Sequence, residues 1–244
     1  MGQKVHPYAF RLPLIRPWVS NWFANRPGDY QQNVQEDIKI RKFLNKKLTD
    51  AGVAAIDIHR NSKSIVVMIR TAKPGVIIGK SGANIETLRD QLNKFMGKPV
   101  EIKIFEVRKA NTNAALVGQK IGNQIERRIA YRRAIKGAIQ EAMEDGALGI
   151  KVSIGGRLNG SDIARRESYK EGNIPLHTLR ADIDYAIYHA QTTFGIIGIK
   201  VWIYKGLVFE GQVANDQGDQ EVKAGLGASR KVDMQDTPAD SVAA

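Results

Sequence analysis

A short loop with two glycines and a lysine has the residue types that hold a phosphate group. The loop residues are Gly79, Lys80, Ser81 and Gly82, and apolar segments flank them on both sides. Glycine lets a ligand approach the backbone closely, and lysine supplies a positive charge. In a nucleotide-binding P-loop, four residues separate the first glycine from the Gly-Lys-Ser sequence. Pro74 stands at that position here and has no N–H group to donate, so the spacing disfavours a nucleotide hydrolase.

The same loop fits the Gly-x-x-Gly pattern with which KH domains clamp the sugar-phosphate backbone of single-stranded nucleic acid. A pattern this short is a weak indication, because an ordinary turn between two helices has the same composition. The elements on either side must therefore decide between a turn and a binding loop. If the loop is a KH-type binding loop, all four of its residues are RNA-binding residues.

The elements around the loop have the lengths and periodicities of a small mixed domain. We predict a helix over residues 34–51, a short apolar helix before the loop and a second helix after it that ends at Gly97. Strands are predicted over residues 55–60, 65–69 and 100–104. The order helix, strand, strand, helix, Gly-x-x-Gly, helix, strand resembles the type II KH domain. This resemblance implies a three-stranded sheet with helices on one side, which we place at residues 34–108.

Over residues 109–210 we predict a second α+β unit, made of two helices on a small, mainly antiparallel sheet. Asn113 can cap the first helix, in which Gly118 and Gly122 leave room for another backbone to approach closely. The other predicted elements are a helix over residues 131–145, strands over 150–154, 180–191 and 196–204, and a polar stretch over 157–174 with room for a short helix.

Positive charge is concentrated in the body of the chain. The net charge is +12, but residues 211–244 contain three basic and six acidic residues, which leaves +15 for residues 1–210. Such an excess attracts polyanions and makes nucleic acid the expected partner, since a basic surface that only maintains solubility rarely needs so much charge. Residues 211–244 also lack aromatic side chains and periodicity, so we expect a disordered acidic tail.

Residues 1–33 form a basic, aromatic-rich extension, for which two interpretations remain open. Aromatic rings with interleaved arginines can stack on bases and contact phosphates of RNA. The same rings can instead pack against the domain that follows. The four prolines of this extension, at positions 7, 13, 17 and 27, disfavour a long helix within it.

The densest group of cations lies in the helix predicted over residues 131–145. Arg132 and Lys136 are one helical turn apart, and Arg133 lies beside them. No carboxylate follows in the sequence before Glu141, so we interpret the three cations as phosphate-binding residues; an ordinary solvated helix face is the alternative. The RNA-binding interpretation extends to further basic residues, namely Lys4, Arg11, Arg108, Arg127, Arg128, Arg157, Arg165 and Arg166.

The sequence shows no pattern typical of catalysis or metal binding. It contains no cysteine, and its four histidines do not have a metal-ligand spacing. Asp182 and Asp184 alternate on a predicted strand, where we expect them to balance arginines such as Arg180. We therefore predict no catalytic residue, no metal site, no cofactor and no small-molecule substrate. No apolar run is long enough to span a bilayer, and we expect a cytoplasmic protein with no membrane partner.

Longer motifs resemble one family of ribosomal proteins. The chain opens with Met-Gly-Gln-Lys-Val-His-Pro and Phe10-Arg11-Leu12, and further motifs are Ile-Gly-Gly-Arg-Leu at 154–158, Pro-Leu-His-Thr-Leu-Arg-Ala-Asp-Ile-Asp-Tyr at 175–185 and Gly-Ile-Lys-Val-Trp-Ile at 198–203. In this order, over residues 1 to about 210, they are similar to the third protein of the small ribosomal subunit in its bacterial form. Ala9 and Pro13 differ, since family members usually have glycine there.

The family resemblance implies a structural constituent of the small ribosomal subunit and not an enzyme. Such proteins bind small-subunit rRNA in the head, beside neighbouring head proteins, and contact mRNA where it enters the subunit. Basic residues at the positions of Arg132, Arg133 and Lys136 are associated with that channel, where they help to unwind structured mRNA. The competing hypotheses are a free KH-type factor that binds single-stranded RNA in processing or decay, and a nucleotide hydrolase.

Overall fold

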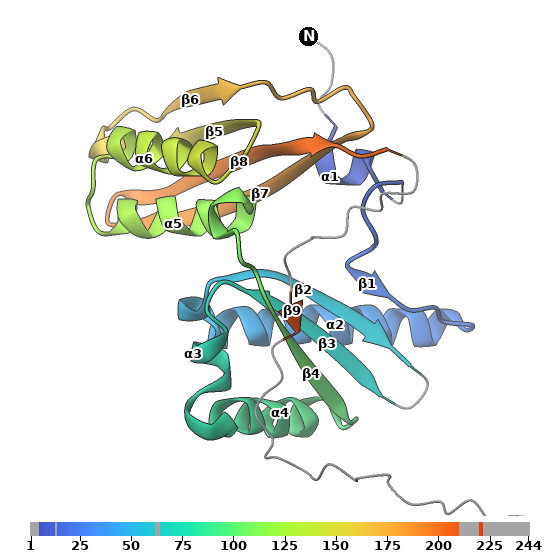
Figure 1. The fold of residues 1–244 in the computed structure, drawn as a ribbon. Helices are drawn as coiled ribbons and strands as arrows, with labels where there is room; N and C mark the ends of the chain where they lie inside the picture. The colour runs from blue at the N-terminus through green and yellow to red at the C-terminus, as the bar shows by residue number, and fades with distance from the viewer. Residues whose placement is uncertain (1–4, 13, 62–63, 210–219, 222–244) are drawn as a thin grey trace, which may run out of the picture.

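The computed structural model describes residues 5–12, 14–61, 64–209 and 220–221. Its helices and strands form two α+β units, one above the other in Figure 1. Each unit has its own sheet and its own hydrophobic core. The predicted α+β fold class is therefore confirmed.

The first unit is a sheet with helices packed on one face. Its central strands are β2 (Val53–Arg60), β3 (Ile65–Thr71) and β4 (Val100–Glu106), with β3 antiparallel to β2 and parallel to β4. Its helices are α2 (Pro27–Lys47), α3 (Pro74–Ile78) and α4 (Ala83–Met96), with the 3-10 turns η1 (Thr49–Ala51) and η2 (Lys80–Gly82). Ile58 and Val67 are cross-strand partners and share one core cluster with Leu92 of α4. The core therefore fixes the helices that flank the glycine loop.

Helix α2 begins at Pro27 instead of residue 34, so the predicted start was wrong. Proline is well suited to the first position of a helix, because its φ is already helical and its missing N–H would have no partner there. Residues 27–33 are polar and almost all exposed. The apolar periodicity that identified the rest of the helix therefore does not extend over its first two turns.

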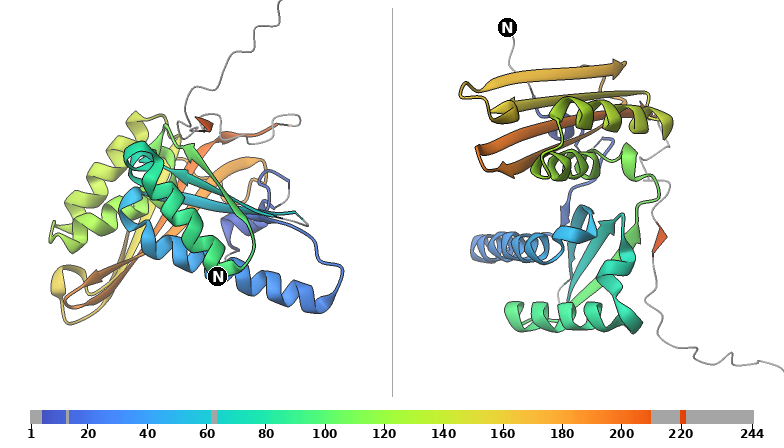
Figure 2. Two further views of the ribbon diagram at one scale, coloured as in Figure 1. Left: turned by 90° about the horizontal axis from the view of Figure 1, so that it is seen from below. Right: turned by 90° about the vertical axis from the view of Figure 1, so that its left-hand side faces the viewer.

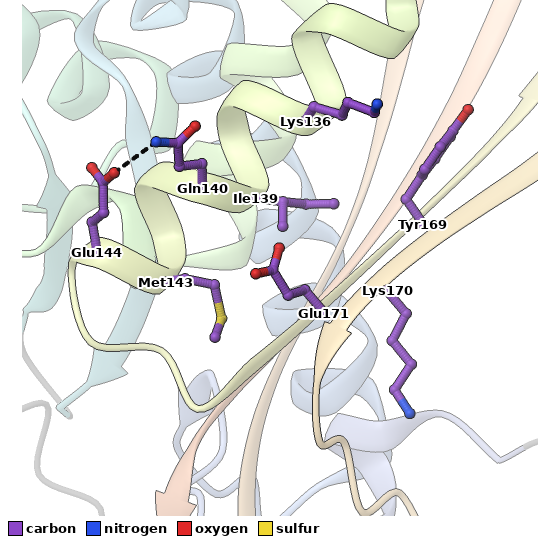
Figure 3. Close-up of a pocket in the computed structure, with 8 residues that line it drawn as sticks. All are labelled: Lys136, Ile139, Gln140, Met143, Glu144, Tyr169, Lys170 and Glu171. Carbon is purple, nitrogen blue, oxygen red and sulfur yellow. Dashed lines mark hydrogen bonds between the residues drawn. The ribbon is translucent and has the colours of Figure 1, made fainter.

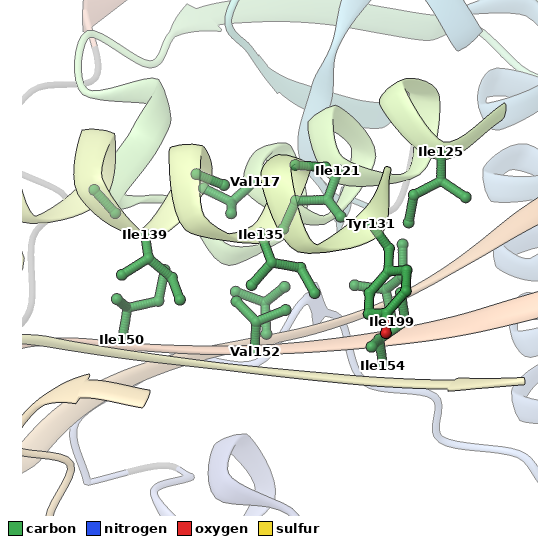
Figure 4. Close-up of a cluster of buried hydrophobic side chains, with 14 of the residues drawn as sticks. Val117, Ile121, Ile125, Tyr131, Ile135, Ile139, Ile150, Val152, Ile154 and Ile199 are labelled. Atoms are coloured by element: carbon green, nitrogen blue, oxygen red, sulfur yellow. The ribbon is translucent and has the colours of Figure 1, made fainter. Parts of the chain in front are cut away.

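The second unit is an antiparallel sheet of four strands in the order β6-β5-β8-β7, with two helices on one face (Figure 2). Its elements are α5 (Ala114–Glu126), α6 (Tyr131–Glu144), β5 (Gly149–Gly156), β6 (Arg165–Gly172), β7 (Ala181–Thr192) and β8 (Gly195–Leu207), with the turns η3 (Ala110–Thr112) and η4 (Leu158–Gly160). Figure 4 shows the core between helices and sheet, where Ile121 of α5 and Ile135 of α6 pack near Val152 of β5. The two predicted helices and the antiparallel sheet are confirmed.

Strand β6 was missed, because residues 157–174 were predicted to be irregular or to contain a short helix. Its residues pair with β5 without a break from Gly172, opposite Gly149, to Arg165, opposite Gly156. The strand lies at the edge of the sheet, and most of its side chains are exposed. An exposed edge strand need not alternate apolar with polar residues, so the pattern that identifies strands is missing.

Helix α5 approaches the sheet closely at its two glycines. A Cβ atom at Gly122 would overlap the ring of Tyr188 on β7, and one at Gly118 would lie 3.3 Å from Tyr188 Cβ. The close approach was predicted, but its partner is a side chain and not another backbone. The aromatic ring occupies the space that a larger helix residue would fill.

The N-terminal segment connects the two units (Figure 1). Helix α1 (Pro7–Phe10) contacts β7 of the second unit, whereas β1 (Ser20–Asn21) pairs in parallel with β2 of the first. Arg11 between them has 0% exposure. Its guanidinium donates hydrogen bonds of 2.6–3.1 Å to the carbonyl oxygens of Pro7, Leu176, Thr178 and Ala181. The prediction that Arg11 contacts RNA does not hold, because none of its surface reaches solvent.

Arg16 forms a second attachment of this segment to β7. Its guanidinium lies 2.8 Å from Asp182 Oδ1 and 3.1 Å from Asp184 Oδ1. Arg180, the partner expected from the sequence, is exposed and forms no ion pair with the two aspartates in the described part of the chain. The strand carboxylates are thus balanced by the N-terminal segment and not by their own strand.

The aromatic rings of residues 1–33 divide between the two interpretations. Trp22 donates its Nε1–H to Asp37 of α2 at 2.8 Å, and His6 makes an edge contact with Tyr185 of β7. These rings pack within the protein. Trp18 and Phe23 are 59% and 87% exposed and remain accessible to a partner.

Little of the predicted acidic tail is part of the described structure. Within residues 211–244 only Gln220–Glu221 are described, as the short strand β9, which pairs antiparallel with Phe105 and Glu106 of β4. The prediction that the tail is disordered otherwise concerns residues outside the described ranges, as does the prediction for Lys4.

Candidate nucleic-acid interface

The glycine loop joins α3 to α4 through three residues with positive φ. The angle is +71° at Gly79, +53° at Ser81 and +84° at Gly82. Glycine reaches such angles without a steric penalty, whereas a serine in this region is uncommon and often marks a functional loop. Lys80 and Ser81 are exposed. The loop therefore presents a cation and a hydroxyl group to solvent at a sharp turn of the backbone.

Asn84 supports the loop from the first turn of α4. Its side-chain Nδ2 donates to the carbonyl oxygen of Val76 at 3.3 Å, across the loop. A Cβ atom at Gly79 would lie 2.5 Å from Asn84 Cγ, so the site accepts only glycine without a shift of Asn84. Val76 itself is 50% exposed beside the loop. A sugar-phosphate segment held by the loop would thus have an apolar surface next to it.

A second group of cations lies on the first turns of α6. Arg132, Arg133 and Lys136 are all exposed, while Ala134 and Ile135 of the same turns are buried. The helix therefore directs its apolar face to the sheet and its cations to solvent. Arg165 of β6, also exposed, joins the group from the sheet.

Glu167 of β6 and Tyr131 of α6 hold two of these arginines in place. The Tyr131 hydroxyl donates to Glu167 Oε1 at 2.8 Å and accepts hydrogen bonds of 3.1 Å from both Arg132 and Arg165. Arg165 Nε lies 3.1 Å and Arg132 Nη2 3.5 Å from the same carboxylate oxygen. Tyr169 donates to the other oxygen at 2.9 Å. We call these five residues the Glu167 network.

The Glu167 network keeps its carboxylate ionised. Hydrogen bonds from Tyr131, Tyr169 and then Arg165 lower the pKa of Glu167 to about 2. The hydrogen bond to Tyr131 is also the main cause that raises the pKa values of Arg132 and Arg165. Both arginines are therefore charged, and the hydrogen bonds of the Glu167 network orient them toward one another.

The absence of a carboxylate near Arg132 in the sequence was misleading. Its partner Glu167 lies 35 positions away and reaches it through the missed strand β6. Arg133 and Lys136, in contrast, form no ion pair with any residue that the structure describes. Sequence reasoning also missed Tyr131 and Tyr169 as positioning residues, because nothing before the fold places β6 beside α6.

A shallow groove of about 710 Å³ runs between α6 and β6 next to Lys136. Figure 3 shows Lys136 at one end of the groove, near Tyr169, and the acidic residues Glu144 and Glu171 further along it. The groove opens to solvent and contains charges of both signs. It provides a wall beside the cations of α6 and has no enclosed space for a small molecule.

Three further residues predicted to bind RNA lie near the cations of α6 or between the two units. Arg127 and Arg128 are exposed in the turn that joins α5 to α6, where Arg128 has a φ of +63°. They lie just before Arg132 in the chain and extend the cationic surface. Arg108 is exposed in the segment between β4 and η3, which connects the two units.

The last two residues predicted to bind RNA, Arg157 and Arg166, lie in different surroundings. Arg157 donates to Ser161 O at 2.9 Å and pairs with Asp162 at 2.9 Å, so it stabilises the turn after β5. Arg166 follows Arg165 on β6 and therefore points to the opposite face of the sheet. It is exposed there and does not belong to the group on α6.

Two classes of site are not found in the described ranges. Groups of three or more His, Cys, Asp or Glu side chains that could hold a metal ion do not occur among the residues of those ranges. Within the same part of the chain, no helix combines the length and the apolar character that crossing a membrane requires.

Comparison with known proteins agrees with both units. Residues 39–112 match the KH domain family, and residues 121–203 match the family described as ribosomal protein S3, C-terminal domain. The small ribosomal subunit proteins uS3 of Streptococcus pyogenes serotype M5 (strain Manfredo) and of serotype M1 are each 54% identical to the chain over 208 residues. These matches cover 85% of the chain and 95% of each relative. The chain therefore belongs to the uS3 family of small ribosomal subunit proteins, as its sequence motifs predicted.

Proposed function

We propose that this chain is a structural protein of the small ribosomal subunit that binds rRNA in the head and contacts mRNA where it enters the subunit. Family membership supports the first part, because the relatives are small-subunit proteins. The charge of +15 on residues 1–210 supports binding to a polyanion. The proposed partners are small-subunit rRNA, mRNA and neighbouring proteins of the head.

The proposed mRNA contact is supported by one group of cations, which contains Arg132, Arg133, Lys136 and Arg165. These four cations lie on adjacent elements, and the Glu167 network fixes two of them. Arginines that are already ordered lose less conformational freedom when they bind phosphate. The surface is therefore suited to hold a nucleic-acid backbone that slides past it without recognising its bases.

Cations of this kind can assist unwinding without an energy source of their own. When the two strands of a hairpin separate, each exposes a phosphate backbone that the cations can neutralise. Holding the separated strands lowers the free energy of the open state, while movement of the ribosome along mRNA supplies the work. A nucleotide site is not needed, in agreement with the spacing of the glycine loop.

The glycine loop is the proposed contact for a single-stranded RNA segment. The exposed Lys80, the tight turn and the apolar Val76 provide the features that such a segment requires. The same geometry would serve a free RNA-binding factor, so the loop alone does not distinguish the two functions. Sedimentation of cell lysate does: a ribosomal protein remains with the small subunit at low magnesium, where the ribosome dissociates, whereas a free factor sediments as a light species.

The mRNA contact is tested in small subunits that contain the triple variant Arg132→Ala, Arg133→Ala, Lys136→Ala. We expect normal translation of an unstructured mRNA and slower passage through a stable hairpin. The control is the α2 triple variant Lys42→Ala, Lys46→Ala, Lys47→Ala, which removes the same charge from exposed positions of another helix. Equal passage through the hairpin in the α6 variant and the wild type would contradict the proposal.

A further inference from the structure

The sheet of the second unit has an outward face that α5 and α6 do not cover, although His6 at the start of α1 contacts Tyr185 on it. Both α5 and α6 lie on the other face, as the right-hand view of Figure 2 shows. Cross-strand partners share a face of a sheet. The buried Ile154, Val152 and Ile199 therefore mark the inward face, and their neighbours along each strand point outward.

Three rows of outward positions carry the side chains considered below, and a fourth row, at the other end of the sheet, contains the buried Tyr204 and Ile183. The row nearest the β7–β8 turn contains Arg166, Gly155, Gly198 and His189, the next contains Ser168, Ser153, Lys200 and Ile187, and the third contains Lys170, Lys151, Trp202 and Tyr185. Four of these residues are cations. Among these outward positions of the described strands, from β6 to β7, none is Asp or Glu.

The cations of this outward face have no acidic partner in the described ranges. Arg166, Lys170, Lys151 and Lys200 form no ion pair there, and Lys151 instead lies over the ring of Trp202 at 5.3 Å. The outer face of the first sheet provides a contrast, since its cations are neutralised. There Arg70 pairs with Asp57 at 3.2 Å and Lys103 lies 3.8 Å from Glu101.

The shape of this outward face favours a nucleic-acid backbone. Gly155 and Gly198 are neighbours in one row, so no side chain projects from the sheet at these two positions, and Arg166 Nε would lie 3.8 Å from a Cβ atom at Gly155. Ser153 and Ser168 add two hydroxyl groups in the adjacent row. Phosphate oxygens accept hydrogen bonds from arginine, lysine and serine, which makes this combination typical of backbone contacts.

The aromatic rings of the third row are partly buried and contact neighbouring rings. Trp202 contacts Tyr185 at a ring distance of 5.1 Å, and Tyr185 contacts His6 of the N-terminal segment at 4.8 Å. Single-stranded RNA is held mainly by stacking of its bases on accessible rings. A helical RNA needs no such rings, because it is recognised by shape and by its phosphates and sugars.

From this geometry we propose that the outward face of the β5–β8 sheet binds the backbone of an RNA helix of the small-subunit rRNA. Its contact residues are Arg166, Lys170, Lys200, Lys151, Ser153 and Ser168. The site is separate from the glycine loop and from the cations of α6, which face the opposite side of the same sheet. This inference rests on the proposed function, which supplies the rRNA.

Binding of the full-length chain to a labelled RNA hairpin tests whether the cations of the outward face hold RNA. We expect the variant Arg166→Ala, Lys170→Ala, Lys200→Ala to bind about tenfold or more weakly and to lower the slope of log K against log salt by about 3, because each of the three cations neutralises one phosphate. The α2 triple variant removes the same charge and should bind like the wild type. An equally weakened affinity in both variants, or an unchanged affinity in the outward-face variant, would overturn the proposal.

Placement in the ribosome is tested with a single cysteine, since the chain contains none. Ser168→Cys carries an iron chelate that cleaves nearby RNA by hydroxyl radicals after assembly into small subunits. Cleavage of an rRNA helix supports the proposal. Incorporation without cleavage, or a cross-link from this cysteine to a neighbouring protein or to residues 211–244, overturns it. Failure of the wild-type chain to enter small subunits would instead contradict the proposed function, and the hairpin measurement would then decide the inference alone.

Discussion

Arg16 donates a hydrogen bond of 3.1 Å to Asp184 although 168 positions separate them in the sequence. The other oxygen of Asp184 accepts the backbone N–H of Ala114, at the start of α5, at 2.9 Å. Burial would raise the pKa of Asp184, but Arg16, Lys205 and the Ala114 N–H outweigh it and hold the pKa below its ordinary value. One carboxylate thus joins the N-terminal segment, β7 and α5.

Replacing Arg16 should destabilise the second unit. In the variant Arg16→Ala, Asp182 and Asp184 lose the guanidinium that they bind. Removing one partner of a buried ion pair costs about 3 kcal/mol of unfolding free energy or more, and we expect the lower end of this range because Asp184 keeps the charge of Lys205. Chemical denaturation of the full-length chain measures the change. The variant Arg180→Ala is the control, because Arg180 is exposed just before β7, near Asp182 and Asp184, and the change should alter stability by less than about 0.5 kcal/mol. Similar decreases in stability in both variants would show that the attachment is not needed.

Gly122 should tolerate alanine poorly. The new Cβ would overlap the Tyr188 ring, and forcing an extra methyl group into packed space costs about 1–3 kcal/mol. Gly137 of α6 is a matched control, since nothing lies within 4 Å of a Cβ there. Gly137→Ala should stabilise the protein by up to about 1 kcal/mol through helix propensity. Thermal unfolding of the two variants would refute this account if both changed stability in the same direction.

The Glu167 network predicts a specific pH dependence. The pKa of Glu167 is 4.5 as an ordinary value and about 2 in the folded chain. The folded state therefore gains stability from this residue above about pH 4.5, and the gain is lost as pH falls towards 2. In Tyr131→Phe the main hydrogen bond is missing, so NMR titration should find a higher pKa for the Glu167 carboxyl group. Tyr188→Phe, on a different strand, should leave the pKa unchanged.

Lys80 should contribute one phosphate contact to single-stranded RNA. Lys80→Ala should weaken binding of a uridine-rich RNA to the full-length chain and lower the salt slope by about 0.7. Lys94→Ala, at an exposed position near the other end of α4, serves as the control. An unchanged slope in the Lys80 variant would mean that the loop does not hold a phosphate.

The sequence predicted those parts of the fold that have a regular apolar pattern. In β3, Ile65, Val67 and Ile69 alternate and are all buried, and the helices of the second unit have clear buried stripes. Strand β6 lacks such a pattern because most of its side chains are exposed. The first turns of α2 lack it for the same reason. Both errors concern stretches of mostly exposed residues, in which apolar periodicity cannot identify the element.

The candidate site was predictable in its cations but not in what holds them. Arg132, Arg133 and Lys136 follow from helical spacing alone. The link from Arg132 to Glu167 depends on where β6 lies, and the burial of Arg11 depends on β7. A basic residue that binds RNA and one that fills the interior look the same in a sequence, since only the tertiary fold determines which carbonyl oxygens surround it.

The N-terminal attachment also constrains the order in which the protein can be completed. Arg11 and Arg16 leave the ribosome that synthesises them early, but Thr178, Asp182 and Asp184, which they bind, are made much later. During that interval the two arginines and their aromatic neighbours are without their partners and accessible to chaperones or to RNA. Contacts so distant in sequence form slowly, so docking of this segment would mark the moment at which the newly made chain becomes ready for assembly.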